Sequence, residues 1–290
     1  MKFDSLTLNR LKRLQFVAQQ IKRGAIKGDR RSSRRGQSIE FADYRDYTPG
    51  DDLRRLDWNI YARHERPFIK LMEDEEDLAV YIILDGSLSM DWGEGDENKF
   101  TFGRRLAAGL GIISLFTGDL LRVEVWGTGT RLGPMRGQAS LTRLFTSLEK
   151  ADPSGEIDFY QEALLFSTFN KRPGLLILLS DCLFPGGYEE GLKHLQSQGH
   201  EIILLHTLTE EERRPSLNGD LRLVDVETGA GQDVSVTPWI RNLYIARVEA
   251  WQSELREFCH RRQIRYFDLT ASSDWDRFLL YEMRKAGALQ

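Results

Sequence analysis

Leu78-Ala79-Val80-Tyr81-Ile82-Ile83-Leu84 is an unbroken run of apolar residues, and Asp85-Gly86-Ser87-Leu88-Ser89 follows it at once. A continuous apolar run of this length is typical of a strand buried on both faces of a sheet. Residues 175–179 and 202–205 have the same character. Since such strands need cover on both sides, the sequence indicates a sheet enclosed between two layers of helices.

Helical patterns separate these strands along the chain. Apolar residues recur every three or four positions over residues 102–116, 141–148, 159–169, 240–259 and 275–284. Shorter strand patterns lie at 121–126 and 264–269, and a β-hairpin is expected as an insertion at about 218–238. The alternation predicts an α/β fold with a doubly wound, mostly parallel sheet and helices on both faces.

The first 77 residues follow a different pattern. Leu11, Leu14, Val17, Ala18 and Ile21 predict an N-terminal helix, whereas residues 37–77 show no clean period beyond a short strand at 67–71. We therefore expect residues 1–77 to form a helical and irregular extension packed on a main domain of residues 78–290.

Charge and composition exclude several classes of protein. The net charge is −4, but the first 72 residues carry 17 Lys and Arg against 9 Asp and Glu, which leaves about −12 for the rest. This asymmetry indicates a local basic segment, at residues 22–35, and not a uniformly basic nucleic-acid binder. Two cysteines are too few for a disulfide framework or a cysteine zinc cluster. No apolar run suggests a signal peptide or a transmembrane helix, so we expect a cytoplasmic protein.

Oxygen-bearing side chains follow two of the buried strands. Ligands of open α/β sheets bind beyond the carboxyl ends of the strands, where Asp85, Ser87 and Ser89 follow one strand and Asp181 follows another. Mg²⁺ and Mn²⁺ prefer carboxylate and hydroxyl oxygens, so these four residues predict a divalent metal site. The alternative is that they cap the free N–H groups of a following helix and bind no metal.

These motifs also carry a resemblance to known families. The spacing Asp85-x-Ser87-x-Ser89 resembles the metal-ion-dependent adhesion site (MIDAS) of von Willebrand factor A-type domains. Three segments are similar to the hallmark of the bacterial domain-of-unknown-function family 58 (DUF58). The first segment contains Arg45-Asp46-Tyr47-Thr48-Pro49-Gly50-Asp51-Asp52, followed by Asp57-Trp58 and Ala62-Arg63. The second segment is residues 84–90, and the third is Asp225-Val226-Glu227-Thr228-Gly229. The resemblance covers residues 28–285.

The resemblance implies a von Willebrand A-like domain without established enzymatic activity, associated with a MoxR-type AAA+ ATPase. It also implies a threonine ligand in the loop of residues 153–158, where Ile157 stands instead. Isoleucine offers no oxygen, so Asp158 or Glu156 is the substitute, or the site is incomplete.

Residues outside the metal loop are candidates for contact with a partner. Trp92 lies in a polar, glycine-rich loop, where an exposed aromatic side chain would anchor a partner. The other candidates belong to the family motif and also suit a structural turn with internal ion pairs: Arg45, Tyr47, Asp51, Asp52 and Arg63.

The leading hypothesis is a non-enzymatic protein-interaction module that captures an acidic side chain of its partner through Mg²⁺ or Mn²⁺. One alternative is a metal-independent scaffold that binds through the basic segment, and another is a metal-dependent hydrolase or phosphatase. No phosphate-binding glycine motif is complete, so we expect no nucleotide. Met90 replaces the second glycine of a nucleophile elbow.

Overall fold

The computed structural model describes residues 4–19, 40–48, 56–64, 66–73, 78–226 and 229–290. Residue contacts divide the chain into a main unit, Met1–Ile21 with Leu78–Gln290, and a second unit, Lys22–Asp77. The sequence placed a boundary at residue 77 but assigned the N-terminal helix to the extension. That helix belongs to the main unit, while the packing of the extension on the main domain stays a prediction.

A six-stranded sheet with the order β10-β7-β6-β3-β4-β5 forms the centre of the main unit. The strands are β3 (Ala79–Asp85), β4 (Leu120–Trp126), β5 (Thr130–Met135), β6 (Leu175–Ser180), β7 (Glu201–Leu208) and β10 (Arg265–Thr270). All neighbouring pairs are parallel except β4 and β5. The predicted doubly wound, mostly parallel α/β sheet is therefore confirmed.

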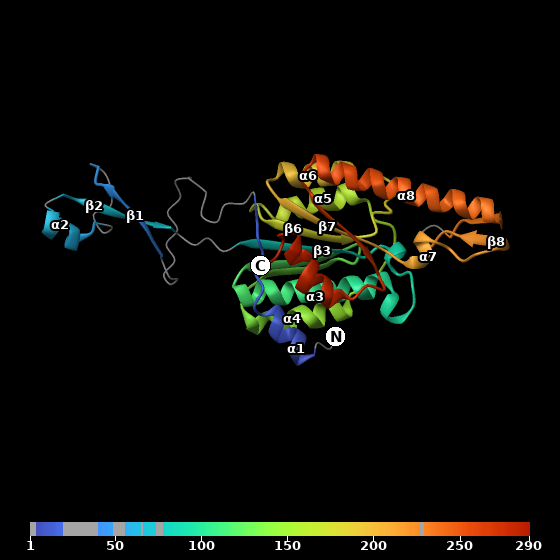
Figure 1. The fold of residues 1–290 in the computed structure, drawn as a ribbon, viewed down its shortest axis with the longest axis horizontal. Coiled ribbons are helices and arrows are strands. Elements are labelled where there is room, and N and C mark those ends of the chain that lie inside the picture. The colour runs from blue at the N-terminus through green and yellow to red at the C-terminus, as the bar shows by residue number, and fades with distance from the viewer. Residues whose placement is uncertain (1–3, 20–39, 49–55, 65, 74–77, 227–228) are drawn as a thin grey trace. The chain divides into compact units, whose positions relative to one another are not determined.

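Two apolar cores lie on opposite faces of the sheet because side chains alternate along each strand. Val80, Ile82 and Leu84 belong to the first core, and Tyr81 and Ile83 to the second. Three helices and a C-terminal segment cover the first core. The helices are α1 (Ser5–Leu11), α3 (Lys99–Thr117) and α4 (Leu141–Lys150). The C-terminal segment consists of α9 (Trp275–Arg277), the π-helical η5 (Phe278–Glu282) and α10 (Met283–Lys285). The second core is covered by α5 (Phe159–Phe169), α6 (Glu189–Ser197) and α8 (Pro238–Arg261), as Figure 1 shows.

The N-terminal helix is shorter than its sequence pattern predicts. Asp4 caps α1, and the helix ends at Leu11. The backbone N–H groups of Gln15 and Val17 then donate to carbonyl groups at the C-terminus, Gln290 and Ala288. The helix prediction is wrong for Leu14, Val17 and Ala18 because this backbone pairing replaces helical hydrogen bonds, and Ile21 lies outside the described residues.

The predicted hairpin is present as β8 (Gly219–Val224) paired antiparallel with β9 (Gly231–Val236). The short α7 (Glu210–Arg213) precedes it, and α8 follows it. Of the 24 residues of α8, only Gln252, Leu255 and Cys259 are buried. The hairpin and the start of α8 extend beyond the sheet in Figure 1.

The second unit has more regular structure than expected. Strand β1 (Glu40–Asp46) pairs antiparallel with β2 (Phe68–Glu73), and α2 (Trp58–His64) lies between them in the chain. The predicted strand at 67–71 is confirmed, but the irregular assignment of residues 40–46 and 58–64 is wrong. The register of β1 shifts between Phe41 and Asp43, and this irregularity removes the strict alternation that marks a strand.

Candidate functional site

The candidate site lies where the chain reverses its direction across the sheet. From β3 the chain continues to β4 on one side, and from β6 it continues to β7 on the other. The carboxyl ends of β3 and β6 therefore border the crevice at which open α/β sheets bind ligands. Asp85 ends β3, and Asp181 follows Ser180 at the end of β6. The fold thus brings together the two segments that the sequence selected.

Asp85 is buried and uses both carboxylate oxygens. Its Oδ1 accepts hydrogen bonds from the Ser87 backbone N–H (2.9 Å) and the Ser87 hydroxyl (2.7 Å). Its Oδ2 accepts from the Ser180 hydroxyl at 2.5 Å. Burial and the negative charge of Asp181 raise the pKa of Asp85 above its ordinary value. A nearby positive charge would therefore stabilise this carboxylate.

The loop after β3 keeps the two serine hydroxyls next to each other, with 2.9 Å between Ser87 Oγ and Ser89 Oγ. Its entry is tight because a Cβ atom on Gly86 would lie 2.6 Å from the carbonyl oxygen of Trp126. Ser87 precedes the short 3₁₀ turn Leu88–Met90, but its side chain makes no capping hydrogen bond. The hydroxyls serve Asp85 and each other, so capping does not account for this cluster.

Two oxygen pairs of this loop have a spacing close to that of neighbouring ligands around an octahedral cation, which is also the length of a hydrogen bond between them. With bonds of about 2.1 Å, neighbouring ligands of Mg²⁺ lie about 3.0 Å apart. The oxygen pairs Ser87–Ser89 and Ser87–Asp85 lie 2.9 Å and 2.7 Å apart. Within the described ranges, no group of three or more His, Cys, Asp and Glu side chains is suited to a metal. A cation here would depend on hydroxyls and water.

Asp181 already has a cationic partner. Lys99 Nζ donates to Asp181 Oδ2 at 2.7 Å, and both side chains are completely buried. The same ammonium forms an ion pair with Glu212 of α7, the short helix after β7. Burial lowers the pKa of Lys99, but the charges of Asp181 and Glu212 outweigh burial and raise it above its ordinary value. The two carboxylates thus favour the charged form of Lys99.

The loop of residues 153–158 lies against the Asp85 loop, as its predicted role requires. The Ser154 N–H donates to the Gly86 carbonyl at 2.8 Å, and the Leu88 N–H donates to the Gly155 carbonyl at 3.1 Å. Ile157 is buried in the second core beside Gly127. An apolar side chain thus occupies the position where a threonine ligand was expected.

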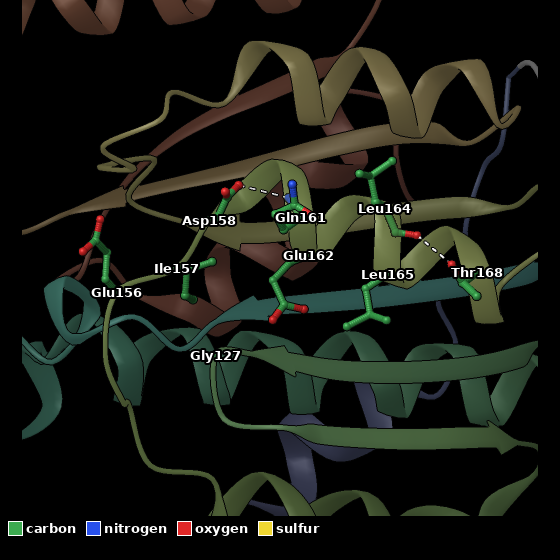
Figure 2. Close-up of a pocket in the computed structure, with 9 residues that line it drawn as sticks. All are labelled: Gly127, Glu156, Ile157, Asp158, Gln161, Glu162, Leu164, Leu165 and Thr168. Carbon is green, nitrogen blue, oxygen red and sulfur yellow. Dashed lines mark hydrogen bonds between the residues drawn. The ribbon is translucent and has the colours of Figure 1, made fainter.

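Asp158 caps α5, since its Oδ1 accepts from the Gln161 N–H at 3.0 Å. Figure 2 shows this bond and the neighbouring Glu156, which is exposed. Asp158, Glu156 and Ile157 line a pocket along α5 together with Glu162 and Leu165. A metal-binding role for Asp158 stays a prediction.

The tryptophan side chains differ in exposure. Trp92 is 48 % exposed, whereas Trp126 is buried in the second core. Trp58 of the second unit is also exposed and packs edge-on against Tyr61.

The partner-binding candidates of the family motif belong to the second unit. The Tyr47 backbone N–H donates to the Pro67 carbonyl at 2.9 Å, and Arg63 is exposed on α2. Arg45 lies on β1 opposite Ile69. Asp51 and Asp52 lie outside the described residues. Their roles in partner contact stay predictions.

Sequence reasoning missed three residues of the site: Ser180, Lys99 and Glu212. One signal was available for Lys99, because it stands at the first position of a long helix. A cation is unfavourable there unless carboxylates surround it. Ser180 and Glu212 become recognisable only once β3, β6 and α7 are placed next to one another.

The fold and the site thus define a doubly wound α/β protein with a serine- and aspartate-lined loop at its switch point. Residues 43–254 match the family described as "Protein of unknown function DUF58", and the chain belongs to this family. Two relatives, described as uncharacterised proteins of Mycobacterium bovis and Mycobacterium tuberculosis, are each 24 % identical over 286 residues. The match covers 96 % of this chain and 90 % of each relative.

Two solved structures are similar in part. A conserved hypothetical protein BatB from Bacteroides thetaiotaomicron has 15 % identity and a TM-score of 0.43, with 72 % of this chain and 98 % of that chain covered. An aerotolerance-related membrane protein from Bacteroides fragilis has 14 % identity and a TM-score of 0.39, with 72 % and 97 % covered. Among the described helices of this protein, none has the length and apolar character needed to cross a membrane.

Proposed function

We propose that this protein is a non-enzymatic interaction module that captures a partner at the loop after β3, with a divalent cation held by Asp85, Ser87 and Ser89. The observation that carries the proposal is the convergence of a buried carboxylate and two adjacent hydroxyls at the sheet's switch point. Their oxygen spacing suits Mg²⁺ or Mn²⁺. When bound, the cation supplies a positive charge that an acidic side chain can complete.

The chain's own residues hold this site in place before any partner arrives. Ser180 fixes one oxygen of Asp85, Ser87 fixes the other, and the Gly86 contacts define the turn. Ser89 is half-buried, so it is partly exposed to solvent. The exposed Trp92 offers an aromatic anchor in the same loop region.

The resemblance to DUF58 proteins suggests a MoxR-type AAA+ ATPase as the partner. An acidic residue of the ATPase would then reach the cation, and binding would need both the metal and that residue. The basic segment of residues 22–35 would add long-range attraction to an acidic surface.

Calorimetric titration of Mg²⁺ and Mn²⁺ into the chelator-stripped protein tests the metal site. We expect binding that Asp85→Ala abolishes and Ser89→Ala weakens, with near-normal folding by circular dichroism. Ser154→Ala is the matched control, because Ser154 lies in the adjacent loop and its hydroxyl donates to the Gly127 carbonyl at 3.0 Å.

Pull-down of a MoxR-type ATPase from the same organism tests the partner. The proposal predicts capture that a chelator removes. Capture that survives the chelator but is lost at high salt would contradict it and favour the metal-independent scaffold. Hydrolysis of a phosphoester that depends on Asp85 would contradict it in favour of an enzyme.

A further inference from the structure

A fully buried lysine lies beside the candidate metal site. Lys99 Nζ has no exposed surface and donates to Asp181 Oδ2 at 2.7 Å. Lysine is almost never buried without partners, since removing an ammonium from water is costly. The carboxylates of Asp181 and Glu212 are the partners that make its burial possible.

The carboxylates around Lys99 are fixed from the other side. Glu212 closes a capping box with Thr209, in which Glu212 Oε2 accepts from the Thr209 N–H at 2.7 Å. Its backbone carbonyl accepts from the Tyr244 hydroxyl at 2.8 Å. Asp181 Oδ1 accepts from the Leu183 N–H at 3.0 Å. Each carboxylate thus presents one oxygen to Lys99 and uses the other to hold the backbone.

Both oxygens of Asp181 thus accept hydrogen bonds, and one of them accepts from a cation, the ammonium of Lys99. The oxygens of Asp85 accept only from neutral donors. A divalent cation bound to Asp181 would have to displace Lys99 or share one negative charge with it. The first would take from the buried ammonium one of its two carboxylate partners, and the second would place two cations against one carboxylate. Both are unfavourable.

We propose that the Lys99 ammonium is the resident cation of Asp181, so that Asp181 is not a ligand of any divalent ion bound at the Asp85 loop. By pairing with Asp181, Lys99 reduces the number of carboxylates that are available to a divalent cation at this site. The folded chain presents Asp85 alone with two hydroxyls, which keeps the affinity for free metal low. This inference rests on the proposed function, in which a carboxylate from the partner is then the second acidic ligand of the cation.

Titration of Mn²⁺ by calorimetry, with electron paramagnetic resonance of bound Mn²⁺ as a second readout, tests this assignment in the full chain. Asp181→Asn should change the Mn²⁺ affinity less than about twofold, while Lys99→Met should raise it about tenfold because a second carboxylate becomes available. Lys99→Arg, which keeps the charge, is the matched control and should gain nothing. Lys99→Met combined with Asp181→Asn should return to the wild-type affinity.

Folding of each variant is checked by circular dichroism. If Lys99→Met does not fold, the double variant Lys99→Met/Glu212→Gln takes its place in the comparison, because it has one unpaired carboxylate fewer. Loss of affinity in Asp181→Asn similar to that in Asp85→Ala, or no gain of affinity in Lys99→Met, overturns the inference. Absence of binding by the wild type together with tight binding by Lys99→Met supports the inference and refutes the metal-dependent part of the proposed function.

Discussion

Buried ionisable side chains in the main unit differ in how they are stabilised. Lys99 remains charged because two carboxylates surround it. His200 has no such neighbour: it is 3 % exposed and packs edge-on against Tyr81 and tilted against Phe166. Burial lowers the pKa of His200 from 6.5 to about 4.

His200 therefore makes the protein sensitive to acid. Because the folded state binds this proton less readily than the unfolded state, the stabilisation is complete above pH 6.5 and is lost as the pH falls toward 4. We expect a loss of about 3 kcal/mol from this residue between pH 7 and pH 4. Urea unfolding of wild type and His200→Leu at several pH values measures it. An unchanged pH dependence in the variant would contradict the prediction.

Gly86 is a second residue with a testable constraint. A side chain at this position would meet the Trp126 carbonyl at 2.6 Å. We expect Gly86→Ala to destabilise the protein by about 1–3 kcal/mol. Gly133→Ala is the control, since its nearest neighbour is the end of the Arg143 side chain at 3.9 Å. Equal melting temperatures for the two variants would argue against a tight turn at Gly86.

At the scale of elements, Asp158 at the start of α5 has two candidate roles, as a helix cap and as a metal ligand, and substitutions distinguish them. If Asp158 acts as a helix cap, Asp158→Ala should cost about 1 kcal/mol and Asp158→Asn much less, because asparagine also caps well. Neither variant should then change the affinity for Mn²⁺. Thermal unfolding and metal titration on both variants measure this, and loss of metal in Asp158→Asn would instead make Asp158 a ligand.

The elements with strong periodicity are those that the sequence predicts. The predicted helix of residues 159–169 coincides with α5, and the apolar run at 175–179 lies within β6. Strand β5 was missed because Gly133 and Pro134 interrupt it, and such residues are tolerated only because β5 is an edge strand. The end of the N-terminal helix was misplaced because Phe16 pairs with Leu289, at the far end of the chain.

In the candidate site, too, the sequence predicts the residues that are close together along the chain and misses contacts between distant segments. Asp85, Ser87 and Ser89 are close in sequence, so their shared loop was readable from spacing. Lys99 and Asp181 are 82 positions apart, and their ion pair exists only because α3 begins beside the end of β6. The spacing of a metal-ligand motif identifies candidate oxygen ligands. It does not identify a lysine, distant in the sequence, that forms an ion pair with one of these carboxylates.

At the scale of the whole molecule, the two units predict independent folding of the larger one. Among the described residues, the members of both apolar cores come from residues 11–16 and 78–289. We expect a chain in which a flexible Gly/Ser linker replaces residues 22–77 to unfold cooperatively, with a melting temperature within about 5 °C of the full chain. Calorimetry measures this, and a non-cooperative transition would show that the main unit needs the second one.

The two ends of the main unit are tied together by antiparallel backbone pairing. Gln15 and Gln290 exchange hydrogen bonds of 3.1 Å and 3.0 Å, and Arg265 binds the carbonyl groups of Val17 and Gly287. A force that pulls on both chain ends enters this pairing at Gln15 and Gln290. It would break the bonds one after another, as in a zipper, and not all at once in shear. We therefore expect this pairing to separate under such a force before any strand of the six-stranded sheet leaves its neighbours.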